Sequence, residues 1–132
     1  MRVGIDLVSV DSVRDSIQVH GEHYLKRIYT ERELLDCQSP AGVDPERLAA
    51  RFAAKEATLK VLRPDGTGLP WNTIEVRRHP AGWVELELSG QAAALAASAG
   101  LDEFALSISH EGGFATAVVI AGPTSETGAI TR

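Results

Sequence analysis

Four charged side chains are clustered in residues 51–60, RFAAKEATLK, and together they could bind a ligand rich in phosphate. The segment is rich in alanine and lacks Gly and Pro, so we predict a helix. At helical periodicity Arg51 and Lys55 share one face, and Glu56 and Lys60 share the next. Three cations around one carboxylate would suit a polyphosphate and its divalent metal. The alternative is a solvated helix whose ion pairs contribute roughly 0.2–0.5 kcal/mol each.

A second carboxylate, that of Asp6, interrupts an apolar N-terminal segment. Val3, Ile5 and Leu7 predict a buried strand that begins almost at the first residue. A carboxylate inside such a strand is costly unless it is paired or holds a metal. The alternative is that Asp6 caps the helix that follows, because Asp and Ser are strong N-cap residues.

A histidine lies beside a predicted tight turn near the end of the chain. Residues 104–121 are predicted to form two strands, and Gly112 and Gly113 supply the positive φ angles of the turn between them. His110 ends the first of these strands. A single histidine in such a place is more often solvated or hydrogen-bonded than a ligand.

In their order and spacing, these three segments resemble the short, single-domain holo-acyl-carrier-protein synthases of the phosphopantetheinyl transferase superfamily. The resemblance rests on G-I-D at residues 4–6, R-F-A-A-K-E-A-x-x-K at 51–60 and S-I-S-H at 107–110. RIYTERELL at 27–35 is also similar to the family's weaker R-I-[FL]-T-x-x-E-L stretch. The similarity extends over residues 3–121.

The resemblance implies an enzyme that transfers the 4′-phosphopantetheine arm of coenzyme A to a serine of an acyl or peptidyl carrier protein. The carrier hydroxyl would attack the β-phosphorus and adenosine 3′,5′-bisphosphate would leave, so positioning and charge neutralisation should supply most of the catalysis. The resemblance also assigns Asp6 and Glu56 as ligands of Mg²⁺, which prefers carboxylate, phosphate and water oxygens. The alternative is a non-catalytic homologue that binds coenzyme A or a nucleotide.

Cationic side chains complete the implied site. Lys60, one turn from Glu56, is expected to meet the diphosphate and steady the leaving group, and these two are the expected catalytic residues. Arg51 and His110 match family positions near the 3′-phosphate of coenzyme A, and the planar fork of arginine suits phosphate. Lys55 is either a further contact to coenzyme A or an outward-facing surface lysine. The proton acceptor is left open between a metal-bound water and Glu56.

The sequence departs from the family's pattern where the carrier protein is expected to dock. Ser9 stands where Glu is common, and Ser12 stands where the family often has an Arg that faces the acidic carrier. His20 and His23 fall where basic residues are frequent. A less acidic carrier, from a polyketide or nonribosomal pathway, is therefore an alternative to a fatty-acid carrier.

Composition narrows the class of protein. A chain of 132 residues suits one domain with a modest core. Its one cysteine, Cys37, excludes an internal disulfide and suits a reducing compartment, so we expect a cytoplasmic protein. We see no signal pattern and no apolar run of membrane-spanning length. The net charge of −5 argues against nucleic acid as the main partner.

The predicted elements indicate an α+β domain over residues 1–121, with a mostly antiparallel sheet packed by one long helix. Strands are predicted at 2–7, 73–77, 83–88 and in the hairpin 104–121, and helices at 10–18, 20–29, 30–37, 45–62 and 89–98. Thr30 and Glu33 form a capping box, and Asp44 caps the long helix, whose first turn accommodates Pro45. Loops are predicted at 39–44 and 63–70, and a disordered tail at 122–132.

A domain this small offers little concave surface for coenzyme A and often gains stability by oligomerising. The resemblance implies a homotrimer with sites between subunits. We expect the interface to be apolar and to use the last hairpin, at Phe114, Ala117 and Val119.

Overall fold

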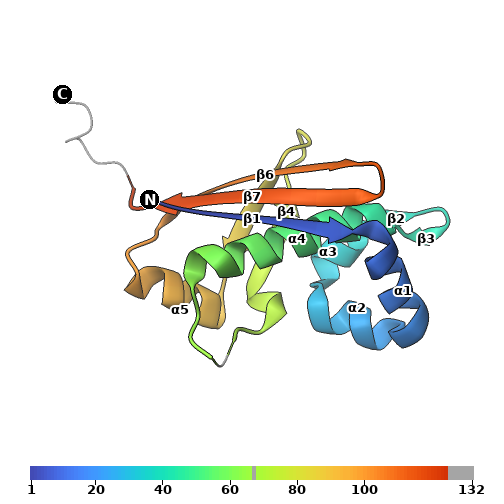
Figure 1. The fold of residues 1–132 in the computed structure, drawn as a ribbon, viewed down its shortest axis with the longest axis horizontal. Coiled ribbons are helices and arrows are strands. Elements are labelled where there is room, and N and C mark those ends of the chain that lie inside the picture. The colour runs from blue at the N-terminus through green and yellow to red at the C-terminus, as the bar shows by residue number, and fades with distance from the viewer. Residues whose placement is uncertain (67, 125–132) are drawn as a thin grey trace.

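Three antiparallel strands form the main sheet of the computed structural model, which describes residues 1–66 and 68–124 (Figure 1). They are β1 (Arg2–Ser9), β6 (Glu103–Glu111) and β7 (Phe114–Gly122), in the order β1-β7-β6. The hairpin β6–β7 confirms the strand–turn–strand prediction. The first and the last segments of the domain are therefore neighbours, and β1 and β6 are the two edges of the sheet.

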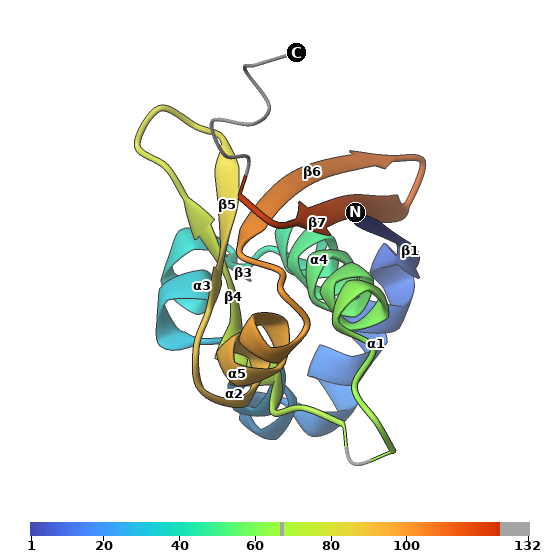
Figure 2. The same ribbon diagram turned by 90° about the vertical axis from the view of Figure 1, so that its left-hand side faces the viewer.

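The long helix α4 (Pro45–Leu62) lies across one face of this sheet, between it and the remaining elements (Figures 1 and 2). Its start is as predicted, because the Asp44 carboxylate accepts a hydrogen bond from the Glu46 backbone N–H at 3.0 Å. Small side chains let the helix approach the strands closely. The buried alanines of α4 are Ala49, Ala50, Ala53, Ala54 and Ala57.

The other elements surround α4, with α1 on one side and the hairpin β4–β5 on another (Figure 2). They are α1 (Val10–His20), α2 (Glu22–Ile28), α3 (Glu31–Asp36), β2 (Gln38–Ser39), β3 (Gly42–Val43), η1 (Trp71–Thr73), β4 (Ile74–Arg78), β5 (Val84–Leu88) and α5 (Gly90–Ser98). The α+β prediction is confirmed. The loop expected at 39–44 instead takes part in the small hairpin β2–β3. In the part of the chain that the structure describes, no helix is both long and apolar enough to span a membrane.

Local capping signals predicted the helix starts well. The Glu33 backbone N–H donates to Thr30 Oγ1 at 3.1 Å, and the Thr30 N–H donates to Glu33 Oε1 at 2.9 Å, which is the predicted capping box. Ser9 caps α1 by accepting from the Ser12 N–H at 3.3 Å. The alternative that Asp6 caps this helix is therefore wrong.

Strand alternation divides the residues of β1 between the two faces of the sheet. Gly4, Asp6 and Val8 face α4, whereas Val3, Ile5 and Leu7 are 67%, 58% and 65% exposed on the opposite face. The prediction of a strand that buries these three apolar side chains is wrong for the single chain. The reason is that α4 covers only one face of the sheet.

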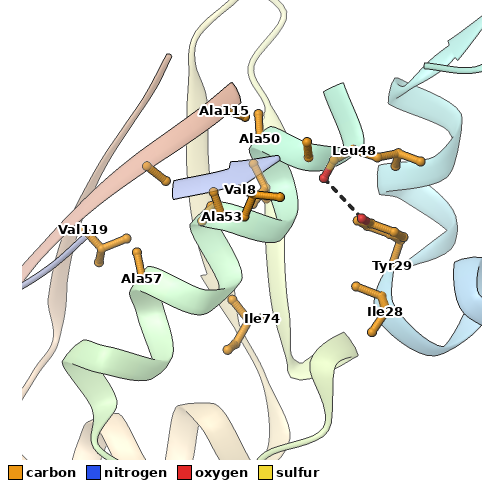
Figure 3. Close-up of a cluster of buried hydrophobic side chains, with 14 of the residues drawn as sticks. Val8, Ile28, Tyr29, Leu48, Ala50, Ala53, Ala57, Ile74, Ala115 and Val119 are labelled. Carbon is orange, nitrogen blue, oxygen red and sulfur yellow. Dashed lines mark hydrogen bonds between the residues drawn. The ribbon is translucent and has the colours of Figure 1, made fainter. Parts of the chain in front are cut away.

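The same alternation corrects the predicted interface residues of β7. Ala117 and Val119 are fully buried toward α4, and Figure 3 shows Val119 beside Ala57. Their side chains therefore cannot contact a neighbouring subunit. Phe114 differs, because it is 49% exposed at the start of the strand.

A second part of the core lies on the side of α4 away from the sheet. Ile28, Tyr29 and Ile74 pack there against the helix (Figure 3). The Tyr29 hydroxyl donates to the Leu48 carbonyl oxygen at 3.3 Å, so this buried polar group is satisfied. Helix α4 is thus buried on two sides.

The domain boundary at residue 121 stays a prediction. Strand β7 ends at Gly122, and the Thr124 hydroxyl donates to the Asp102 carboxylate at 2.9 Å. The rest of the predicted tail, 125–132, lies outside the described residues.

Gly4 lies where β1 crosses α4. A Cβ added at this position would overlap the carbonyl oxygen of Ala57 and would lie 3.1 Å from a methyl group of Val61. The Ala57 carbonyl group is part of the α4 backbone, so it can move away from this Cβ only if the helix shifts. The absence of a side chain at Gly4 is therefore what allows the strand and the helix to approach each other.

We expect Gly4→Ala to reduce the free energy of unfolding by about 1–3 kcal/mol, because overpacking of this size displaces backbone. Urea denaturation measures the change. Gly66→Ala is the matched control, since a Cβ there would meet nothing within 4 Å. Equal stability of Gly4→Ala and the unaltered protein would show that the crossing is not tightly packed.

Candidate functional site

Two carboxylates and a lysine meet where β1 crosses α4. Lys60 Nζ donates to the Ile5 carbonyl oxygen at 2.6 Å and lies 3.4 Å from Asp6 Oδ1, although Asp6 and Lys60 are 54 positions apart in the sequence. Glu56 lies one helical turn before Lys60 on α4 and interacts electrostatically with both Asp6 and Lys60. The structure thus brings together three of the predicted site residues, which we call the carboxylate cluster: Asp6, Glu56 and Lys60.

Repulsion within the carboxylate cluster indicates that it suits a cation. Burial raises the pKa of Glu56, the nearby Asp6 carboxylate raises this pKa further, and Lys60 opposes the shift. The cluster thus sets two carboxylates beside one lysine. Mg²⁺ is commonly held by one or two carboxylates, with phosphate and water oxygens as the other ligands, and Asp6 and Glu56 fit that pattern. No cluster of three or more His, Cys, Asp or Glu side chains able to hold a metal occurs among the described residues.

A second group of charged side chains lines a cavity of about 210 Å³. Arg51 and His110, both predicted from the sequence, contribute to its lining. The wall residues come from the end of α3, from α4, from the hairpin β4–β5 and from β6. We call this space the arginine cavity; its charged lining residues are Asp36, Arg47, Arg51, Arg78 and His110.

Arg51 lines the arginine cavity and carries an unused hydrogen-bond donor. Its side chain is only 4% exposed, and Nη1 donates to the Arg47 carbonyl oxygen at 3.3 Å. Its Nε is buried and has no hydrogen-bond partner among the described residues. A buried, unpaired N–H of a cation is costly. The guanidinium charge of Arg51 at the cavity wall would favour an anion in the cavity. His110 lies 3.2 Å from the Glu46 carboxylate, which would pair with a protonated imidazole.

Lys55 belongs to neither group. Its side chain is fully buried and lies 2.8 Å from Glu33 Oε1, which is also fully buried. Burial lowers the pKa of Lys55, and the Glu33 carboxylate opposes that shift. The structure therefore does not place Lys55 where it can contact coenzyme A, and the alternative of an outward surface lysine is wrong. The cause is that this side of α4 packs against α3 and β4.

Sequence reasoning missed three charged residues of the arginine cavity. Arg47 precedes Arg51 by four positions, so helical periodicity could have identified it. Asp36 and Arg78 lie on α3 and β4, and only the tertiary structure brings them to α4.

The carboxylate cluster and the arginine cavity lie on different sides of α4. Glu56 follows Arg51 by five positions, which corresponds to about 140° around a helix. The cluster includes a residue of β1 and the cavity includes residues of β6, and these strands are opposite edges of the sheet. Together the two groups could bind a ligand with a metal-bound diphosphate and a further phosphate.

Comparisons with known proteins agree with this chemistry. Residues 2–119 match the family model "4′-phosphopantetheinyl transferase superfamily". The chain is 44% identical over 121 residues to a holo-[acyl-carrier-protein] synthase of Koribacter versatilis, a match that covers 89% of this chain and 94% of that protein.

Solved structures show the same fold. The ACPS–CoA complex of Chronobacterium ammoniagenes has a TM-score of 0.81 at 31% identity, and the match covers 93% of this chain and 97% of that one. The Helicobacter pylori holo-[acyl-carrier-protein] synthase in complex with coenzyme A has a TM-score of 0.79 at 27% identity, with 92% and 100% covered.

In the metal-free protein, we expect Asp6→Asn to lower the pKa of Glu56, because the substitution removes a repelling charge and releases Lys60 from Asp6. Carboxyl-detected NMR titration without divalent ions measures this pKa. Asp11→Asn, which breaks the exposed Asp11–Arg14 pair, should leave it unchanged. If Asp6→Asn also left it unchanged, the two carboxylates would not share a site.

Proposed function

The chain belongs to the 4′-phosphopantetheinyl transferase superfamily, and from this membership we propose that it acts as a holo-[acyl-carrier-protein] synthase. It transfers the 4′-phosphopantetheine arm of coenzyme A to a carrier serine. The observation that carries this proposal is the carboxylate cluster at the β1–α4 crossing, in a chain so similar to such synthases. A non-catalytic coenzyme A-binding homologue would have no need for the costly repulsion between Asp6 and Glu56.

The reaction exchanges one phosphorus–oxygen bond for another. The carrier serine oxygen attacks the β-phosphorus, the bond to the bridging oxygen breaks, and adenosine 3′,5′-bisphosphate leaves with the negative charge. Lys60 supplies a cation that stabilises this charge. The serine proton passes to Glu56 or to a water beside it.

Asp6 and Glu56 are the residues that would hold Mg²⁺. When bound, the ion neutralises the charge of the diphosphate, which is a main requirement of phosphoryl-type transfer. The support for this assignment is that the two carboxylates meet at the β1–α4 crossing, close enough for Asp6 to raise the pKa of Glu56.

The arginine cavity would bind the 3′-phosphate of coenzyme A. The support is the buried, unpaired Nε of Arg51, with Arg47, Arg78 and His110 in the same lining. The solved relatives of Chronobacterium ammoniagenes and Helicobacter pylori carry coenzyme A, which is consistent with this use. Lys60 would meet the diphosphate, which is attached to the 5′-carbon of the same ribose.

Exposed residues of α1 and α2 would receive the carrier protein. Two of their cations are already engaged, because Arg14 lies 2.6 Å from Asp11 and Lys26 lies 3.6 Å from Glu22. Ser12 is exposed where the family often has an arginine. We therefore include a weakly acidic acyl or peptidyl carrier in the proposal. We also propose a cytoplasmic location, because a single cysteine suits a reducing compartment.

The outer face of the sheet would form the interface of a homotrimer. Val3, Ile5 and Leu7 are more than half exposed there, and Ile120, the cross-strand partner of Val3, is 41% exposed. A contiguous apolar face of this kind commonly marks an interface. In such an assembly the carboxylate cluster of one subunit and the arginine cavity of the next would form one site.

Transfer itself is tested by mass spectrometry of a purified carrier protein incubated with coenzyme A and Mg²⁺. The protein should add one phosphopantetheine, and EDTA should stop the reaction. Asp6→Ala and Glu56→Ala should each lose about 3 kcal/mol of transition-state stabilisation, roughly a hundredfold in rate. Glu103→Ala, an exposed carboxylate outside the site, is the control. A folded Asp6 or Glu56 variant with normal turnover would refute the metal assignment.

Arg51→Ala should weaken the binding of coenzyme A by about 1.5–3 kcal/mol, and that of dephospho-coenzyme A much less. The reason is that the proposed partner of Arg51 is the 3′-phosphate, which dephospho-coenzyme A lacks. Calorimetric titration with both ligands measures the difference, and Arg32→Ala, at an exposed arginine of α3, serves as the control. Equal losses for the two ligands would place Arg51 at another part of the nucleotide.

Ile5→Asp should convert the trimer into monomers, because a buried charge opposes an apolar interface. Light scattering coupled to gel filtration measures the mass. Leu35→Asp tests the same change at a side chain that is 73% exposed on α3, and it should remain a trimer. An unaltered protein that is monomeric and fully active at assay concentration would refute the assembly.

A further inference from the structure

The buried ion pair between Glu33 and Lys55 has every polar atom engaged. Glu33 Oε1 accepts from Lys55 Nζ at 2.8 Å and from the Thr30 N–H at 2.9 Å, and Oε2 accepts from the Val76 N–H at 2.7 Å. Both side chains are fully buried. A network in which each buried group is satisfied leaves few alternative geometries.

Lys55 extends this network to the segment that enters β4. Its Nζ donates to the Trp71 carbonyl oxygen at 3.2 Å and to the Ile74 carbonyl oxygen at 2.5 Å. With Glu33 as the third acceptor, all three N–H donors of the ammonium have partners. One pair of side chains therefore ties together α3, α4, η1 and β4.

Three of the four elements tied by this pair, α3, α4 and β4, also supply walls of the arginine cavity. On α4, Arg51 lies one helical turn before Lys55; on α3, Asp36 lies one turn after Glu33. On β4, Arg78 follows Val76 by two positions and so lies on the same side of the strand. Three charged residues of the cavity therefore lie one helical turn, or two strand positions, from a residue of the network.

We propose that Glu33 and Lys55 are a positioning pair, which sets the spacing of the cavity walls and thereby the selectivity for the 3′-phosphate of coenzyme A. This inference rests on the proposed function, because it presumes that the arginine cavity receives that phosphate. Stability alone does not account for the pair, since well-packed apolar residues often replace a buried ion pair without loss. A need to hold α3, α4 and β4 at fixed distances around the arginine cavity does account for the pair.

The test compares Glu33→Gln, Lys55→Met and the double variant in transfer assays with coenzyme A and with dephospho-coenzyme A. The readout is the ratio of kcat/KM for the two substrates, measured where circular dichroism shows folded protein. The double variant leaves no buried charge, so it should fold even if a single variant does not. Glu87→Gln is the matched control. It breaks the exposed 2.8 Å pair between Glu87 and Arg77, which both lie on the hairpin β4–β5.

We expect the selectivity for coenzyme A to fall by about tenfold or more in the folded variants, through a higher KM and with kcat less affected, since misplaced binding groups act in this way. A merely structural role would lower activity with both substrates equally and would leave the ratio unchanged. An unchanged ratio in a folded variant overturns the inference about the pair. The proposed function is not affected by that result if the unaltered protein still transfers phosphopantetheine. Absence of transfer by the unaltered protein would instead refute the proposed function.

Discussion

The close crossing of β1 over α4 is the constraint on which the rest of the structure depends. It requires Gly4, because any Cβ there would overlap the Ala57 carbonyl oxygen. The crossing brings Asp6 of the strand to Lys60 of the helix at 3.4 Å and close enough to Glu56 to raise its pKa. A small residue in the strand thus allows two carboxylates from distant segments to share one site, at the cost of repulsion that a cation relieves.

Helix α4 organises the chemistry because its different sides serve different tasks. One side carries alanines against the sheet, another carries Glu56 and Lys60 toward β1, and a third carries Arg51 into the arginine cavity. Lys55, on the side toward α3 and β4, is buried and paired with Glu33. The sequence predicted that the charged side chains of this helix bind a ligand, but one of them, Lys55, instead joins α4 to α3 and β4 inside the fold.

Features set by neighbouring residues were predictable from the sequence. The Thr30–Glu33 box and the Asp44 cap are local hydrogen bonds, and the structure contains both. The need of Asp6 for a partner could be anticipated, because a carboxylate within an apolar strand is costly when unpaired, and the structure supplies Lys60 as that partner. The burial of Lys55, the inward side chains of Ala117 and Val119 and the exposed face of β1 could not, because they depend on which face of each element the fold covers.

A crystal grown with coenzyme A and Mn²⁺ in place of Mg²⁺ would locate the ion, because Mn²⁺ gives an anomalous signal. We expect a peak coordinated by Asp6 and Glu56, with the diphosphate beside Lys60 and the 3′-phosphate on Arg51 of the arginine cavity. An ion held by other residues, or a 3′-phosphate outside that cavity, would contradict this assignment.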